Sequence, residues 1–353
     1  MSRWRCRDRF PVAMIDADVH IPNPRLRELL PFLSEHWIEH FSNTLDKGAS
    51  QQYYPPRSPV TGRGGGLEEL QEAVFDRGGA EVAVASCLYA VDSIHNPDAA
   101  IALATATNDW QSREWLEREP RLRGSVVVPI QLPAAASEEV ERHADRPGFV
   151  QVLIPVRTEH PLGSRHYHPL WKTIEQSGLV AAIHFGGAPV MPPTPTGWPS
   201  FFLEEYTAMA QVFATQLTSM IVEGVFDACP DLRVVFLESG FTWIPAHLWR
   251  MDKEWRNLRR LVPWVRRPPS DYFREHVRVG IQPLDAPPVP AQLLEVVEQL
   301  GSDDLLLFAS DYPHVHACDA GERLLPLLPA TLQRKIRDEN ARSLYRLPEG
   351  GVP

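Results

Sequence analysis

The sequence predicts a single (β/α)8 TIM barrel, because eight short apolar runs alternate with amphipathic helical segments along most of the chain. The 353 residues are enough for one such barrel with insertions. Four of the runs lead into metal-capable side chains, as expected at a barrel mouth, where the carboxyl ends of the strands meet. An open doubly wound sheet is the competing fold, but no GxGxxG follows the first run and no GxxxxGK[ST] occurs.

Strands are expected where a short apolar run is bounded by turn-forming residues. In chain order these runs are Ala13–Ile15, Glu81–Tyr89, Ser125–Ile130, Phe149–Ile154, Leu179–Ile183, Arg233–Leu237, Val277–Ile281 and Leu305–Ala309. Helical spacing of apolar residues predicts the intervening helices. They are Pro97–Glu119, Ser137–His143, Pro169–Ser177, Glu204–Ala228, Trp243–Leu261, Val289–Leu300 and Ala330–Leu344.

The whole chain, 1–353, is expected to form one domain, with the barrel at about 13–345. Residues from about 40 to 80 form a long insertion after the first strand, which can act as a lid. No second domain and no internal repeat is indicated.

Composition excludes several classes of function. The net charge of −10 argues against a nucleic-acid partner, because phosphate binding needs a basic surface. The N-terminus lacks the apolar core of a signal peptide, and no stretch approaches the length of a membrane span, so we expect a soluble, cytoplasmic protein. A homodimer through Trp243, Trp249, Trp255 and Trp264 is one option, although tryptophans at helical spacing more often belong to a core.

Five metal-capable side chains stand at or just beyond predicted strand ends: Asp18, His20, His184, Glu238 and Asp311. Strand ends converge in a barrel, so these residues can surround one cation despite their separation in sequence. Residues i and i+2 of a strand share a face. We therefore expect Asp18 and His20 to point into the mouth and Asp16 to point inward lower down.

Asp311 is the strongest single candidate, in Phe-Ala-Ser-Asp-Tyr-Pro-His at the last strand tip. A carboxylate there can bind a metal and take a proton from a metal-bound water. His314 lies close by in sequence, as a substrate contact, a supporting group or a plain loop residue. His184 precedes two glycines that leave space, although a lone histidine after a strand is often a core residue. Glu238 needs a partner if buried, and capping of the next helix is the competing interpretation.

Three further residues are candidates for binding substrate. His166 and His168 flank Tyr167 in a loop, and Trp198 lies in the aromatic, proline-rich loop 189–202. These loops can line the mouth, while a solvent-facing position is the competing interpretation.

The residues and their order resemble the amidohydrolase superfamily, in particular its branch related to aminocarboxymuconate-semialdehyde decarboxylase. The resemblance extends from Ile15 to Tyr345. Its motifs are Asn96-Pro-Asp98, Asn108-Asp-Trp110, Pro120-Arg-Leu-Arg-Gly124, Pro161-Leu-Gly163, Ile183-His-Phe-Gly186, Glu238-Ser-Gly240, Ser310-Asp-Tyr-Pro-His314 and Asn340-Ala-Arg342. It implies a metal-dependent barrel enzyme, either a hydrolase or a non-oxidative decarboxylase. By position, Asp18 and His20 match the first-strand metal pair, His184 matches the fifth-strand ligand, and Asp311 matches the eighth-strand ligand and general base.

Two positions depart from the family pattern. Asp18 replaces the first histidine of the usual His-x-His pair, which favours zinc, manganese or iron with mixed nitrogen and oxygen ligands. Glu238 stands where the family usually has a histidine, and the glutamate that accompanies it in related decarboxylases is missing from 239–242. The fourth strand ends at Ile154-Pro155 without a lysine to bridge two metals, so one ion is expected, with a second left open by Glu238.

These departures favour hydrolysis. In the leading hypothesis, Asp311 activates a metal-bound water that attacks the carbonyl of a small-molecule amide, ester, lactone or thioester, including acyl-CoA. His184 and Glu238 place the metal, and His314 or His166 assists the leaving group. The alternative is decarboxylation of an aromatic or enoic carboxylate, in which the metal holds the carboxylate and an adjacent hydroxyl and Asp311 delivers the proton. A barrel that binds without catalysis is a third hypothesis.

Overall fold

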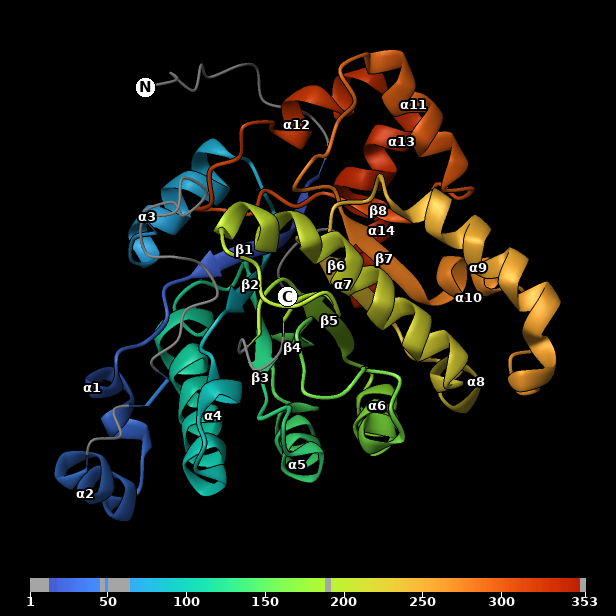
Figure 1. Cartoon of the computed structure of the whole chain (residues 1–353). Coiled ribbons are helices and arrows are strands. Elements are labelled where there is room, and N and C mark those ends of the chain that lie inside the picture. The colour runs from blue at the N-terminus through green and yellow to red at the C-terminus, as the bar shows by residue number, and fades with distance from the viewer. Residues whose placement is uncertain (1–12, 45–47, 50–63, 188–191, 350–353) are drawn as a thin grey trace.

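The structure, a computed structural model, describes residues 13–44, 48–49, 64–187 and 192–349. Its eight strands form one sheet in sequence order, with each neighbouring pair parallel, and the sheet curves into a barrel (Figure 1). The strands are β1 Ile15–Ile21, β2 Val82–Cys87, β3 Leu122–Val127, β4 Phe149–Pro155, β5 Val180–His184, β6 Val234–Leu237, β7 Val277–Gly280 and β8 Leu306–Leu307. The predicted (β/α)8 barrel is thereby confirmed.

The barrel closes between β1 and the residues around β8. The N–H of Ala17 donates to the carbonyl of Phe308 over 2.9 Å, and the N–H of Asp311 donates to the carbonyl of Asp18 over 3.0 Å. Val19 and Tyr312 pair as a parallel bridge. Closure therefore joins the two ends of the chain at the strand tips that carry Asp18 and Asp311.

Helices cover the outer face of the sheet (Figure 1). They are α1 Leu26–Leu29, α2 Glu35–Asn43, α3 Leu67–Leu70, α4 Pro97–Gln111, α5 Pro133–His143, α6 His168–Ser177, α7 Phe202–Val222, α8 Val225–Ala228, α9 Ile244–Leu258, α10 Pro269–His276, α11 Pro290–Gln299, α12 Ala320–Arg323, α13 Ala330–Arg334 and α14 Asn340–Tyr345. The long helix predicted over 204–228 is divided into α7 and α8. Gly224 stands between them with φ +76°, a left-handed conformation that ends a helix at little cost for glycine.

The apolar core has two layers. An outer layer fills the space between sheet and helices, and an inner layer fills the barrel with alternate strand residues such as Val82 and Val84. The terminal helix α14 adds Leu344 and Tyr345 to the inner layer. The Tyr345 hydroxyl donates to the Gln151 side chain of β4 over 2.8 Å. The barrel is thus a packed core with its site at one end, and not a pore.

The insertion predicted over about 40–80 contributes the end of α2 and all of α3, and its residues 45–47 and 50–63 lie outside the described part. Its role as a lid therefore stays a prediction, as does the single domain. Among the described helices, none combines the length and apolar character needed to cross a membrane.

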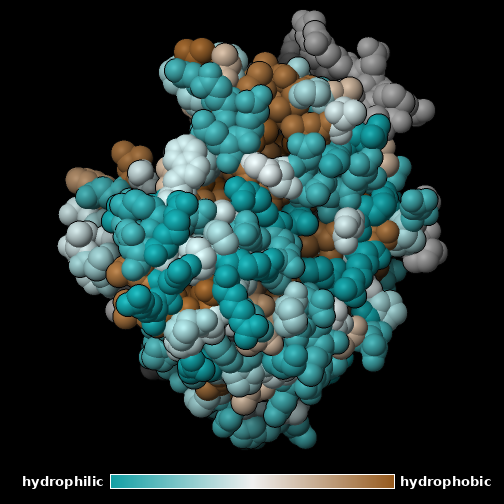
Figure 2. Space-filling view, turned by 90° about the vertical axis from the view of Figure 1, so that its right-hand side faces the viewer, coloured by the Kyte–Doolittle hydropathy of each residue, from teal (hydrophilic) through white to brown (hydrophobic). Residues whose placement is uncertain are grey.

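The four tryptophans of the predicted dimer surface differ in their exposure. Figure 2 shows one face that is mainly hydrophilic, with hydrophobic areas between the hydrophilic side chains. Trp249 and Trp264 are 56% and 38% exposed. Trp243 and Trp255 instead pack partly against the core. A dimer through this surface stays a prediction.

Candidate metal centre

The five predicted ligands converge at the carboxyl ends of four strands. Asp18 and His20 lie in β1, His184 is the last residue of β5, Glu238 directly follows β6, and Asp311 lies in the segment after β8. All five are at most 6% exposed. Ionisable side chains are rarely buried to this extent unless they pair with one another or bind a metal.

The first strand is longer than predicted and irregular. It contains Asp18 and His20, and its pairing with β2 shifts register between Asp16 and Val19. A bulge of this kind re-aims side chains, and bulges are common next to active sites. Asp16 does not join the cluster. Its carboxylate instead accepts the N–H groups of Asp18 and Ser310, so the expected inward position lower in the barrel is wrong.

Short distances connect the cluster. The Nε2 atom of His20 lies 2.9 Å from Asp311 Oδ1 and 3.2 Å from Glu238 Oε1. The Nε2 atom of His184 lies 3.4 Å from Asp18 Oδ2 and 3.8 Å from Glu238 Oε1. Ser86 of β2 donates its hydroxyl to Asp18 Oδ1 over 3.1 Å, which orients that carboxylate from outside the cluster.

His184 has the environment of a metal ligand. Its Nδ1 lies 2.7 Å from the carbonyl oxygen of Phe185, so Nδ1 carries the proton and donates it there. Its Nε2 atom, which then has a lone pair, is buried and has no hydrogen-bond partner. A ring nitrogen held by a backbone carbonyl on one side, with an unused lone pair among carboxylates on the other, is typical of histidine bound to metal.

The backbone is unusual at two of the carboxylates. Glu238 has φ +53° and Asp311 has φ +58°, the left-handed conformation that non-glycine residues adopt at a cost of roughly 1 kcal/mol. Such conformations concentrate at functional sites. Here they turn both side chains toward the common centre, immediately beyond the strands that carry them.

Two histidines from the segment after β8 complete the cluster. The Nδ1 atom of His314 lies 2.8 Å from Asp311 Oδ1 and 3.1 Å from Glu238 Oε1. His316 contacts Asp311 Oδ2 through Nε2. His314 was expected near Asp311 from the sequence, whereas His316 was not. Two histidines spaced i, i+2 beside a strand-tip aspartate were the available signal.

The carboxylates and imidazoles of the cluster shift one another's pKa values. Burial raises the pKa of Glu238 to about 7, and the charge of Asp311 adds to the rise. Burial opposes ionisation of Asp311 as well, but hydrogen bonds from His20, His314 and His316 hold its pKa well below the usual range. Burial lowers the pKa of His314, yet its bonds to Asp311 and Glu238 raise it to about 9. Protons on histidine thus balance the carboxylates, a role that a bound cation takes over when it displaces those protons.

Two overlapping sets of four residues can hold a metal ion. One is Asp18, His20, His184 and Glu238, and the other is His20, Glu238, Asp311 and His314; within each set the ligand atoms lie within 4.8 Å of one another. Mixed imidazole and carboxylate ligands suit borderline metals such as zinc, iron and manganese. The residues present therefore fit a divalent transition metal.

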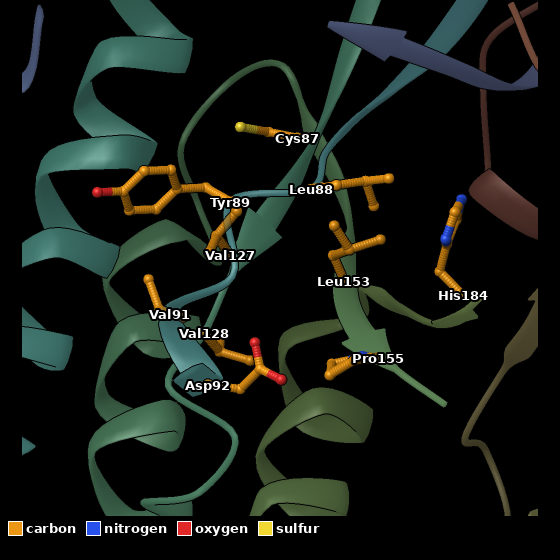
Figure 3. Close-up of a pocket in the computed structure, with 10 residues that line it drawn as sticks. All are labelled: Cys87, Leu88, Tyr89, Val91, Asp92, Val127, Val128, Leu153, Pro155 and His184. Atoms are coloured by element: carbon orange, nitrogen blue, oxygen red, sulfur yellow. The ribbon is translucent and has the colours of Figure 1, made fainter. Parts of the chain in front are cut away.

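A narrow pocket adjoins this centre. It lies at the carboxyl ends of β2 to β5 and has His184 at one side and mostly apolar walls (Figure 3). Its unfilled space is about 310 Å³ when the open side is included. The closed part has room for about one water molecule.

The three predicted substrate-binding residues do not contact the cluster. The ring of His166 packs against His160 and Tyr167, and the Nε2 atom of His168 lies 3.1 Å from the carbonyl oxygen of Gly163. Trp198 is 60% exposed in the loop between β5 and α7. The structure thus brings none of them to the metal centre, and their role in substrate binding stays a prediction.

A closed parallel barrel with buried carboxylates and imidazoles at its mouth defines a metal-dependent enzyme of the (β/α)8 class. The chain belongs to the amidohydrolase family, whose model matches residues 15–347. The predicted resemblance to the amidohydrolase superfamily is confirmed.

Related sequences are decarboxylases. Gamma-resorcylate decarboxylase of Rhodococcus jostii (strain RHA1) is 28% identical over 282 residues, which cover 73% of this chain and 80% of that protein. Gamma-resorcylate decarboxylase of Rhizobium radiobacter is 26% identical over 299 residues, which cover 80% of this chain and 88% of that protein.

Solved structures share the fold. The 5-carboxyvanillate decarboxylase of Sphingomonas paucimobilis superposes with a TM-score of 0.69 at 21% identity, over 96% of this chain and all of that chain. The dihydroxybenzoic acid decarboxylase of Polaromonas sp. JS666, with bound manganese and 2-nitroresorcinol, superposes with a TM-score of 0.68 at 21% identity, over 95% of this chain and 97% of that chain. The ligand cluster fits the predicted divalent transition-metal cofactor, and the similar Polaromonas protein holds manganese.

The leading hydrolase hypothesis is wrong, because these relatives are decarboxylases and support the alternative instead. The glutamate missing from 239–242 weakens the decarboxylase interpretation in the sequence. In the structure, His314 brings an imidazole to within 3.1 Å of Glu238 from the segment after β8. The site therefore has both a carboxylate, from Glu238 after β6, and an imidazole, from His314 after β8, instead of the expected histidine and glutamate of the sixth strand.

Proposed function

We propose that this enzyme is a metal-dependent, non-oxidative decarboxylase of an aromatic or enoic carboxylic acid. Two observations support the proposal. The similar proteins include decarboxylases of gamma-resorcylate, 5-carboxyvanillate and dihydroxybenzoic acid. The chain also gathers carboxylates and imidazoles at one buried point, next to a narrow pocket whose walls are mostly apolar.

Asp18, His20, His184 and Asp311 would hold the ion, with Glu238 as a further ligand. The metal, when bound, would fix the substrate carboxylate and an adjacent hydroxyl and withdraw electron density from the ring. Both candidate ligand sets share His20, whose Nε2 lies 2.9 Å from Asp311 and 3.2 Å from Glu238, and one ring nitrogen binds one ion at a time. We therefore expect about one ion per chain, and manganese is the first metal to test because a similar structure holds it.

The reaction breaks the bond between the ring carbon and the carboxylate carbon, releases carbon dioxide and adds one proton to the ring carbon. Asp311 is positioned to deliver that proton. Its Oδ1 contacts His20 and His314, and its Oδ2 contacts His316, so imidazole N–H groups can return a proton after each turnover. Glu238 accepts from His314 and holds that ring against Asp311.

The observation that carries the proposal is the unpartnered Nε2 of His184, aimed at Asp18 and Glu238, in a chain related to decarboxylases. The test is to load the protein with manganese and incubate it with 2,6-dihydroxybenzoate, 5-carboxyvanillate and other hydroxybenzoates. Carbon dioxide release and the decarboxylated phenol would be measured together.

Equal amounts of carbon dioxide and phenol, lost in Asp311→Asn, are the expected result. Metal-loaded protein that releases no carbon dioxide from any aromatic or enoic acid would refute the proposal. Glu138→Gln, a substitution of an exposed residue of α5 that does not belong to the cluster, is the matched control for loss of one carboxylate.

A further inference from the structure

We infer that Ser86 is a positioning residue that leaves Asp18 a single oxygen for the metal and thereby favours manganese over calcium. This inference deepens the proposed function, because it rests on a metal ion bound at the cluster and concerns how the chain selects that ion. The effect of Ser86 on the ion is exerted through the carboxylate of Asp18.

The bulge in β1 brings Ser86 to the side of the metal cluster. Ser86 pairs with His20 in the ladder between β1 and β2, beyond the register shift between Asp16 and Val19. If the register of the pair Asp16 and Ala83 continued without the shift, Ser86 would instead stand beside Val19. Because a slip of one residue moves side chains to the other face of a sheet, the bulge gives Ser86 and His20 the same face.

The hydroxyl of Ser86 holds one oxygen of Asp18. It donates to Oδ1 over 3.1 Å, and this is its one hydrogen bond in the described part of the chain. Both residues are at most 1% exposed, so water does not compete for the bond. A hydrogen bond to an ionised carboxylate is also roughly twice as strong as one between neutral groups. Ser86 therefore fixes the orientation of the carboxylate from the β2 side.

The other oxygen of Asp18 faces an unused ring nitrogen. Oδ2 lies 3.4 Å from Nε2 of His184, a buried nitrogen without a hydrogen-bond partner. Oδ1 lies 3.8 Å from Nε2 of His20, beyond hydrogen-bond distance. The two oxygens thus differ in their surroundings: Oδ1 accepts from serine, and Oδ2 is left for an ion.

The number of available oxygens decides which ion fits. Calcium takes about six to eight oxygen ligands and often uses both oxygens of a carboxylate. The candidate set that contains Asp18 also supplies the imidazoles of His20 and His184, which suit transition metals better than calcium. A carboxylate limited to one oxygen withholds a further ligand that calcium would use. Ser86 therefore strengthens the preference of the site for a transition metal such as manganese.

Metal affinity tests the inference apart from catalysis. Dissociation constants of manganese and of calcium would be measured by calorimetry on the metal-free protein. Wild type would be compared with Ser86→Ala and with the pair Ser86→Thr and Ser86→Val, which introduce side chains of nearly the same shape that differ in the hydroxyl. The melting temperature of each metal-free variant shows whether it is folded.

Ser270→Ala is the matched control. Ser270 is another buried serine, and its hydroxyl donates to Oδ2 of Asp252 over 2.8 Å. Asp252 lies in α9 and belongs to neither candidate ligand set. The control therefore removes the same kind of hydrogen bond at a carboxylate outside the metal centre.

Ser86→Ala and Ser86→Val are expected to weaken manganese binding about tenfold or more, the usual effect of losing a group that orients a metal ligand. Calcium binding should weaken less or become tighter, because Oδ1 becomes available to the ion. The preference for manganese over calcium should therefore fall in both variants. Ser86→Thr should keep the wild-type preference, since it retains the donor. Ser270→Ala should bind both ions as wild type does.

Unchanged manganese binding in Ser86→Ala would overturn the inference and leave the proposed function intact. Equal behaviour of Ser86→Thr and Ser86→Val would do the same, because the effect would then come from packing and not from the hydroxyl. If either of these two variants does not fold, the ratio of the manganese and calcium dissociation constants in Ser86→Ala decides, and a wild-type ratio there removes the selecting role. Folded wild-type protein that binds no divalent transition metal would instead defeat the proposed metal-dependent function.

Discussion

Two buried clusters of acid and histidine in this barrel differ in how their charges are satisfied. In the first, between α4 and α5, Glu139 receives hydrogen bonds from Asn108, Arg142, His143 and Thr105, at 2.7 to 3.1 Å. In the second, at the barrel mouth, only histidines of the described part lie within ion-pair distance of Asp18 and Asp311.

The pKa values follow this difference. Burial alone would raise the pKa of Glu139, but the bonds from His143, Arg142 and Asn108 lower it to about 2. Burial raises the pKa of Glu238 at the mouth to about 7 instead. The guanidinium of Arg142 balances the charge of Glu139 in the first cluster, whereas the carboxylates of the second face histidines, and we expect a bound cation to complete their charge balance.

Asp311→Asn is expected to give the largest effect. It removes the group proposed to deliver the proton and weakens a proposed metal ligand, while the similar shape preserves packing at a fully buried position. Decarboxylation should fall by roughly a thousandfold or more, within the range of general acid catalysis. The rate of carbon dioxide release checks this, with the circular dichroism melt as a test of folding. Activity within tenfold of wild type would remove Asp311 from the role assigned to it.

Glu139→Gln should have the opposite profile, with stability lost and metal binding kept. A folded-state pKa of about 2, against an ordinary value of 4.5, means that ionised Glu139 stabilises the fold above pH 4.5. This stabilisation is lost as pH falls from 4.5 through 2. We expect the variant to lose about 3 kcal/mol of unfolding free energy at pH 7 and to show a flatter acid dependence.

Urea unfolding at several pH values, with manganese content measured in parallel, distinguishes the clusters. Glu138→Gln on the same helix is the matched control, because that side chain is exposed. If Glu139→Gln kept its full stability, or lost its metal, the contrast between the two clusters would not hold.

Removal of the metal should lower the unfolding free energy by somewhat less than the Glu139→Gln substitution does. A chelator is expected to lower the melting temperature of the loaded wild type by a few degrees, since a ligand at a hundred times its dissociation constant contributes about 2.7 kcal/mol. His184→Ala should lose the ion and be insensitive to the chelator. Elemental analysis with differential scanning fluorimetry measures both effects. Two tightly held ions in wild type would contradict the single site inferred from the shared His20.

Much of this contrast was predictable from sequence, and some was not. The eight strands and the meeting of five acidic and histidine side chains at the mouth were predictable because parallel barrel strands are buried on both faces, so Glu238 and Asp311 stand out at the ends of apolar runs. Whether these five side chains bind a metal stays a prediction. The bulge in β1 that excludes Asp16 depends on register with β2, which no local pattern reveals. His316 was missed because its place beside Asp311 depends on the path of a loop. Hydrolysis and decarboxylation were not separable, because both use the same kind of ligand set and differ in what the pocket admits.

The smallest effect is expected for His166→Ala. His166 is an exposed side chain whose ring contacts are His160 and Tyr167, and neither residue belongs to the metal centre. Its replacement should change kcat and KM less than about twofold and unfolding free energy by less than about 0.5 kcal/mol, as for ordinary surface substitutions. Steady-state kinetics of His166→Ala and His184→Ala would be measured side by side. This compares a histidine outside the barrel mouth with one inside it. A clear rise in KM for His166→Ala alone would show that its loop reaches the bound substrate, and the boundary of the functional region would then extend beyond the strand tips.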